Sequence, residues 1–214
     1  MKGRHWLAAI LIGTVAVLLL LWLARAMIAV RFAHSYFRQH GVESDVEIGT
    51  LGLSGASARF ALGPKDAPDI AADKIELFFD PLRWVPYVVE VRLVNPVVRV
   101  RVDENGKPNL GSLQNWIDSL KSQQGKSAYV SDDLAVSLTG LRLLLTTPGG
   151  ALDVRGDVKL VKNLPHTANL RVQPATIAWQ GTRIALRGAG LAFDNPTGHL
   201  AVRFQGAVGN ASIA

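Results

Sequence analysis

The sequence predicts a mainly β protein in which an N-terminal transmembrane helix precedes an antiparallel, twisted β-sheet with one short helix. Three observations lead to this prediction. Residues 6–24 contain no charged side chain, most later segments alternate apolar and polar residues with a period of two, and one later segment has helical spacing. The chain divides accordingly into an anchor with a juxtamembrane helix, residues 1–41, and a β-domain, residues 42–214.

The predicted anchor matches the thickness of a bilayer. At 1.5 Å per residue, a helix over residues 6–24 spans roughly 28 Å, close to the ~30 Å hydrocarbon core. The helical pattern continues beyond the span to residue 40, where Gly41 is a typical stop. This continuity favours an uncleaved anchor over a signal peptide cut after Ala26. The predicted membrane-embedded residues are Trp6, Leu7, Ile10, Leu18, Leu21, Trp22 and Leu23.

Composition excludes several classes of site. The chain has no cysteine, so disulfides, thiolate metal sites and cysteine nucleophiles are absent. Its net charge of +6 comes from dispersed Lys and Arg residues, typical of a solvated surface, with attraction to anionic lipid head groups as the alternative. The sequence has no basic stripe with interleaved aromatic residues, which is the pattern that would indicate nucleic-acid binding. No GxSxG, SxxK, Walker A or GxGxxG motif occurs, and the histidines lack ligand spacing. We therefore expect no enzyme, catalytic residue, metal or cofactor, and binding or transport is the default.

The first strands are expected soon after residue 42. Glycines at positions 49, 52, 55 and 63 separate short apolar alternations, as in a twisted hairpin, and residues 70–79 form a further strand. The clearest alternation covers residues 88–103. Pro96 in its middle favours an edge strand or a bulge, and Asn105-Gly106 is a typical tight turn.

One helix is predicted beyond the anchor, from Asn109 to about Leu120. Leu113, Trp116 and Leu120 recur on one side of it, which would let it plug one end of the sheet; a plain crossover between strands is the alternative. A meander of strands follows, over residues 134–145, 151–161, 168–179, 183–193 and 199–209. The last segment would leave a bare sheet edge. We therefore expect the N-terminal part of a longer protein, or else an edge that pairs with a partner.

Strand periodicity sorts the apolar side chains into faces. Val98, Val100 and Val102 share one face, and Arg99 and Arg101 lie on the opposite, wet face. Leu152, Val154, Val158 and Leu160 share a face unless a bulge at Gly156 shifts them. A dry face that no helix covers must be closed, paired or filled by a ligand. Ten residues would form a continuous apolar path if they faced one concave surface: Ile75, Leu77, Phe79, Val98, Val100, Val102, Leu152, Val154, Val158 and Leu160.

The segment over residues 75–113 resembles the AsmA-like, TamB and YdbH family of inner-membrane-anchored envelope proteins. Its strand from Ile75 to Pro81 ends in Asp-Pro, a second strand runs from Val91 to Val100 through a proline, and a turn leads into a short helix. The turn carries Asp103, Gly106, Asn109 and Leu110. With the preceding "RQHGV", residues 1–120 are most similar to the YdbH branch, whose members are usually longer than this chain.

The resemblance implies a repeating β-groove anchored in the bacterial inner membrane by one span, with the β-domain in the periplasm. Such a groove would carry phospholipids by their acyl chains between the inner and outer membranes, in outer-membrane biogenesis. The implied partners are phospholipid, the inner membrane and an outer-membrane protein. The alternative is an anchored scaffold that assists outer-membrane protein assembly by strand addition.

Overall fold

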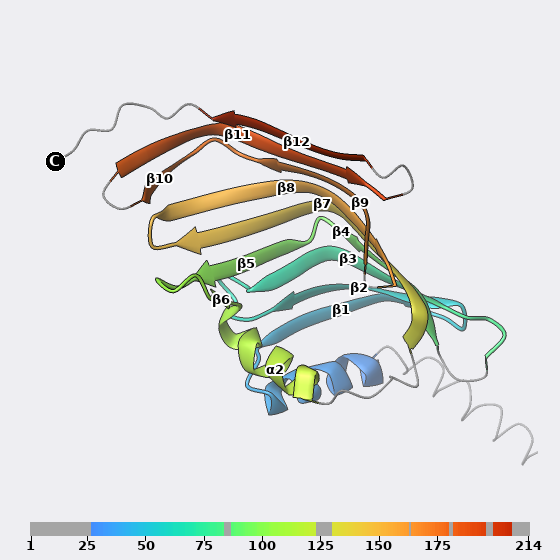
Figure 1. Cartoon of the computed structure of the whole chain (residues 1–214). Coiled ribbons are helices and arrows are strands. Elements are labelled where there is room, and N and C mark those ends of the chain that lie inside the picture. The colour runs from blue at the N-terminus through green and yellow to red at the C-terminus, as the bar shows by residue number, and fades with distance from the viewer. Residues whose placement is uncertain are drawn as a thin grey trace, which may run out of the picture.

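A computed structural model describes residues 27–83, 87–122, 130–162, 164–179, 182–195 and 199–206. Its main feature is one curved sheet of 12 strands, with the short helix α2 near β1 (Figure 1). The elements are β1 (Ser44–Leu51), β2 (Gly55–Leu62), β3 (Ile70–Phe79), β4 (Val88–Val94), β5 (Val97–Val102), β6 (Pro108–Asn109), η1 (Gly111–Leu113), α2 (Gln114–Ser122), β7 (Val130–Thr147), β8 (Gly150–Val161), β9 (Leu164–Val172), β10 (Ala175–Trp179), β11 (Thr182–Asp194) and β12 (His199–Gly206).

The sheet is mixed, so the prediction of an antiparallel sheet is wrong at two strand pairs. The main order is β1-β2-β3-β4-β7-β8-β9-β11-β10, with β5 also pairing with β3 and β7, and β12 with β11. β4 and β5 both run parallel to β7. The reason is the connection after β5, which passes through β6, η1 and α2, because a crossover of this length returns the chain to the end from which it started.

The helix that precedes β1 ends where the sequence predicts. Residues 27–39 are helical, and Gly41 follows with a φ of 72°. The Gly41 amide donates to the Arg38 carbonyl and the Val42 amide to the Phe37 carbonyl, each at 3.0 Å, which is the pairing of a Schellman motif. None of the described helices is long and apolar enough to cross a membrane. The predicted anchor, with Trp6 to Leu23, lies outside the described residues.

The predicted second helix is confirmed, with a later start. Pro108–Asn109 pairs with β5 as the two-residue strand β6, so helical structure begins only at Gly111. The Asn109 side chain accepts a hydrogen bond from the Gly111 amide at 2.7 Å, which holds this change of direction.

Three irregularities line up across neighbouring strands and bend the sheet. The β2–β3 register shifts next to Asp73, Asn95-Pro96 separates β4 from β5, and the β7–β8 register shifts between Leu138 and Leu141. Hydrogen bonds connect them, because the Asn95 side chain donates to Asp73 at 2.9 Å and its amide to the Thr139 carbonyl at 2.8 Å. Bulges bend strands and increase their twist. Pro96 therefore lies in a break between β3 and β7, not at an edge.

The bulge keeps apolar residues on one side of the sheet. β8 pairs with β7 at Leu152, Val154, Val158 and Leu160 without an irregularity of its own at Gly156. The extra residue lies in β7 instead, where Leu138 pairs with Val158 and Leu141 with Gly156. Gly156 has a φ of 154°, and a Cβ atom there would collide with the Asn169 carbonyl oxygen.

Gly156→Ala should therefore destabilise the fold by about 2–4 kcal/mol, because the backbone of β9 would have to move. Urea unfolding followed by circular dichroism measures the change. Gly106→Ala is the matched control, since Gly106 also has a positive φ, of 76°, but has nothing within 4 Å of its Cβ position. It should cost only about 1 kcal/mol. Equal losses in the two variants would contradict this role for Gly156.

Candidate functional site

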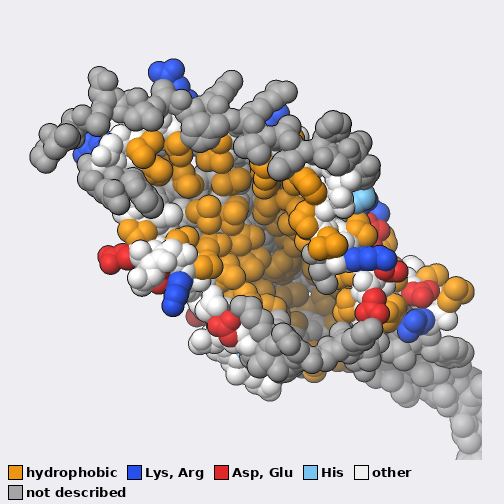
Figure 2. All heavy atoms as spheres, in the orientation of Figure 1, with side chains coloured by type: hydrophobic (Ala, Val, Ile, Leu, Met, Phe, Trp, Pro, Cys, Tyr) orange, Lys and Arg blue, Asp and Glu red, His pale blue; other side chains and the backbone are white. Residues whose placement is uncertain are grey.

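The candidate site is the apolar face of the sheet. In every strand pair that the structure describes, the positions on this face are apolar, glycine, serine or threonine, without a charged residue. Figure 2 shows the result, a hollow lined by hydrophobic side chains with charged side chains around its rim. Among the described residues, the buried apolar ones are few: Val42, Leu62, Ala72, Pro96, Leu113 and Leu141. The face is therefore a lined groove and not the interior of a closed core.

The register brings the predicted groove residues to this one face. Ile75 and Leu77 of β3 pair with Leu93 and Val91 of β4, and Phe79 follows on the same side of β3. The other seven lie on β5 and β8, which both flank β7: Val98, Val100, Val102, Leu152, Val154, Val158 and Leu160. All ten are half-buried.

β7 joins the two predicted sets. Leu143 pairs with Val98 on one side and with Val154 on the other, and Leu145 pairs in the same way with Val100 and Leu152. The groove is therefore continuous from β5 to β8. Contact of these residues with lipid stays a prediction.

Several groove residues were missed from the sequence. Leu141, Leu143 and Leu145 line the face next to Leu138 only because the bulge at Thr139–Gly140 changes the alternation. The glycine at position 140, inside an alternating strand, was the available sequence signal for this bulge; in the structure it has a φ of 68°. On β11 a second shift, next to Gly188, likewise keeps Leu186 on the face that carries Ala189.

One end of the groove is closed by a cap, formed by residues 27–39 with η1 and α2. Leu113, fully buried, packs with Val42 and Leu62. Partly buried residues surround this cluster: Phe37, Phe60, Ile70, Leu110, Trp116 and Ile117. Phe60, Leu62 and Ile70 belong to the apolar face by register, so the cap covers the groove at β2 and β3. The sequence predicts that the helix from Asn109 to about Leu120 closes one end of the sheet, and the packing of η1 and α2 agrees with this prediction.

A buried carboxylate fastens the cap to the sheet. Asp69, only 6% exposed, accepts hydrogen bonds from the Ser112 amide at 2.9 Å and the Ser112 hydroxyl at 2.7 Å. Its own carbonyl accepts from the Arg99 amide at 2.8 Å. One residue thus joins β3, β5 and the start of the cap. Because Gly111 lies against this carboxylate, a side chain there would collide with it.

Comparison with known families decides the identity. A family model described as YdbH-like, intermembrane phospholipid transport protein YdbH, matches residues 13–214. The chain belongs to the YdbH-like family. The resemblance to the YdbH branch is thereby confirmed, and the family is one of intermembrane phospholipid transport. Comparisons with curated proteins and with solved structures found no match.

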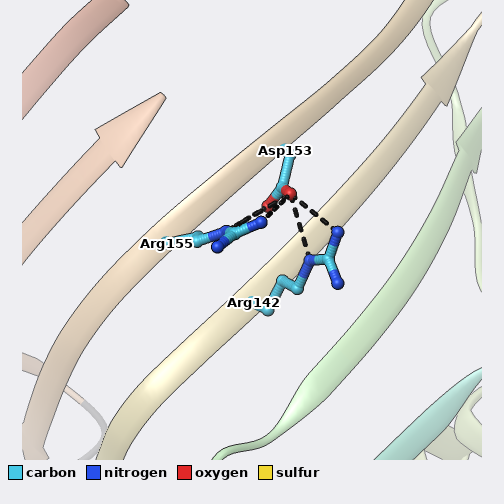
Figure 3. Close-up of polar contacts among 3 residues, drawn as sticks. All are labelled: Arg142, Asp153 and Arg155. Atoms are coloured by element: carbon cyan, nitrogen blue, oxygen red, sulfur yellow. Dashed lines mark hydrogen bonds and ion pairs between the residues drawn. The ribbon is translucent and has the colours of Figure 1, made fainter. Parts of the chain in front are cut away.

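The outer face of the YdbH-like sheet is polar. Asp153 of β8 lies between Arg142 and Arg155 there (Figure 3), at 2.9 Å from the Arg142 Nη2 atom and 2.8 Å from the Arg155 Nη2 atom. The hydrogen bond from Arg155, together with that from Arg142, lowers the pKa of Asp153 below its usual 3.8. No group of three or more His, Asp or Glu side chains among the described residues could hold a metal ion.

Trp116→Glu should loosen the cap of this YdbH-like chain. Trp116 stacks edge-on against Phe37 at a centroid distance of 5.5 Å, and a carboxylate there would lie within an apolar cluster. We expect a loss of about 3 kcal/mol in the free energy of unfolding, measured in urea. Asn115→Glu, at the exposed neighbouring position, is the control and should change little. Indistinguishable unfolding curves would show that Trp116 closes nothing.

Asp153→Asn should change the acid stability of the sheet. Because the pKa of Asp153 is lowered in the folded state, its stabilising effect is complete above pH ~4 and is lost as the pH falls through the lowered value. The wild type should therefore be more stable than the variant at pH 7, and this advantage should shrink at pH 3. Urea unfolding at both pH values measures it, with exposed Asp45→Asn as the control. A difference independent of pH would refute the role of the carboxylate charge.

Proposed function

We propose that this chain carries phospholipids between the inner and outer membranes by holding their acyl chains in the apolar groove. Residues 6–24 anchor it in the inner membrane, the β-domain lies in the periplasm, and the chain acts without enzymatic chemistry. The observation that carries the proposal is the charge-free apolar face that remains uncovered beyond the cap, in a member of a phospholipid transport family.

The dimensions of the groove suit an acyl chain. Nine strands, counted along the main path, lie about 4.8 Å apart, which gives a groove roughly 38 Å long. One leaflet of a ~30 Å hydrocarbon core is about 15 Å thick, so a lipid tail fits along the groove with room to move. Burial of each methylene contributes about 0.8 kcal/mol in the groove and a similar amount in the bilayer. Exchange between the two is therefore nearly balanced, as a reversible carrier requires.

The cap gives the groove a direction. It covers the apolar face at β2 and β3, whereas the hydrophobic lining continues over β7, β8, β9 and β11. In our proposal, lipid enters laterally beyond the cap and moves away from the anchored end. The head group stays in water at the rim, where the charged side chains lie (Figure 2).

Two neighbouring residues of β8 provide a matched test. Val158 faces the groove and Lys159 faces outward, so Val158→Glu places a charge among lipid tails and Lys159→Glu does not. Desolvation of a carboxylate costs several kcal/mol. We expect Val158→Glu to reduce the phospholipid that co-purifies with the full chain at least about tenfold, measured by native mass spectrometry, and Lys159→Glu to leave it unchanged.

Circular dichroism should confirm that both variants fold. Equal lipid loads in the two variants, or no lipid on the wild-type chain, would refute the groove as the carrier. The second candidate function, a scaffold for outer-membrane protein assembly, predicts a different pattern. Photo-crosslinkers at the open strand edge would then give protein adducts, and photo-crosslinkers along the groove face would give no lipid adducts.

A further inference from the structure

The outer face of the sheet carries two different patterns of charge. On β1 to β4, each cation has an acidic neighbour: Arg59 with Glu47, Lys74 with Glu76, and Arg92 with Glu90, at 3.9, 2.5 and 2.7 Å. Charges of opposite sign on neighbouring positions of a sheet stabilise it weakly. On this half of the outer face, every cation is therefore offset by a carboxylate of the chain itself.

On β5 to β9, cations exceed their partners. Five arginines, which we call the outer arginine patch, lie on this part of the outer face: Arg99, Arg101, Arg142, Arg155 and Arg171. Arg155 pairs directly with Arg142 on one side and with Arg171 on the other. Like charges opposite one another destabilise a sheet. Asp153 offsets this repulsion at Arg142 and Arg155, but in the described part of the chain Arg171 has no compensating carboxylate.

The carboxylates of this region do not neutralise the patch. Asp153 is shared by Arg142 and Arg155, and Asp157 accepts a hydrogen bond from the Gly140 amide at 2.8 Å. Within the described part of the chain, Arg101 and Arg171 make no ion pair and no side-chain hydrogen bond. Both are exposed, so their guanidinium donors are available to a partner.

A cavity of about 380 Å³ adjoins the patch. Arg99, Arg101 and Arg142 line it together with apolar residues, among them Leu144, Ala151 and Pro174, and with Asp69 and Asp153, whose carboxylates already accept hydrogen bonds from Ser112 and from the two arginines Arg142 and Arg155. Its volume is in the range of ligand pockets, and mixed apolar and arginine linings are typical of the centres of protein interfaces. The cavity can therefore receive an apolar side chain flanked by carboxylates.

We propose that the outer arginine patch binds an acidic polypeptide segment of a partner protein. Carboxylates would pair with the arginines, in the bidentate geometry that guanidinium groups favour, while an apolar side chain enters the cavity. A planar membrane fits less well, because the face is the convex side of a curved sheet (Figure 1) and only a few arginines could touch a flat surface at once. A flexible peptide can follow the curvature. The arginines of this site lie on the opposite face from the lipid groove, and the proposal does not depend on the function of the groove.

The test uses the full chain in nanodiscs of zwitterionic lipid. The probe is a fluorescent eight-residue peptide of alternating Glu and Leu, and its Gln–Leu counterpart is the neutral control. We expect the acidic peptide alone to bind, measured by fluorescence anisotropy, and to bind at least about tenfold more weakly in 300 mM than in 50 mM salt. The double variant Arg101→Glu, Arg171→Glu should weaken binding at least about tenfold.

The matched control is Arg59→Glu, Lys65→Glu, which makes the same charge change at exposed positions outside the patch and should bind like the wild type. Arg101→Gln, Arg171→Gln should give an intermediate loss and guards against misfolding of the charge-reversed chain. Equal weakening in the patch and control variants, or no binding of the acidic peptide, would overturn the proposal. Patch-dependent capture of phosphatidylglycerol vesicles without peptide binding would overturn it in favour of a membrane surface.

Discussion

The structure depends on keeping one apolar face in phase across strands that are individually irregular. A sheet bends into a groove only where its ladder is interrupted, and every extra residue exchanges the two faces of the strand that carries it. Here the interruptions occur at matching heights on β3, at Asn95-Pro96 and on β7, so the chain compensates on each strand. The groove can be both strongly curved and free of charge because these positions coincide.

The cap covers the apolar face of the sheet's first strands. An uncovered apolar face over β1 to β3 would be open at the end next to the N-terminal helix. The cluster around Leu113 covers it with side chains from two helices that are far apart in sequence. Asp69 makes this arrangement specific, since a buried carboxylate needs its hydrogen-bond partners and only the Ser112 segment supplies them. Apolar contact alone would allow the helices to slide.

Local sequence patterns correctly predicted the features that depend on neighbouring residues only, such as the two faces of a strand and the end of a helix. The two-residue period correctly placed Val98 and Val100 on one face of β5, and Val154 and Val158 on one face of β8. Gly41 correctly marked the end of the first helix. The sequence could not show that these faces coincide, because that depends on which strand lies between β5 and β8. Pro96 was ambiguous for the same reason, since a break inside a sheet and an edge strand leave the same trace in the sequence.

The non-local features had no sequence signal of their own. Arg142 and Arg155 are each unremarkable members of alternating strands, and only the register places them opposite one another with Asp153 beside both. The parallel pairing of β7 likewise follows from a crossover whose helix was predicted but whose direction was not. The anchor of residues 6–24 stays a prediction.

The crossover that contains η1 and α2 of the cap also favours an order of assembly. The hairpins from β1 to β4 and from β7 to β9 need only short turns, so they can form early and independently. The parallel pairing of β7 with β4 and β5 closes a much longer loop, in which η1 and α2 are the intervening structure. The pairing that joins the two halves of the sheet therefore also holds η1 and α2 in a closed loop that begins at β5. A chain that has assembled its full sheet has, for this topological reason, tethered the second half of its cap at both ends.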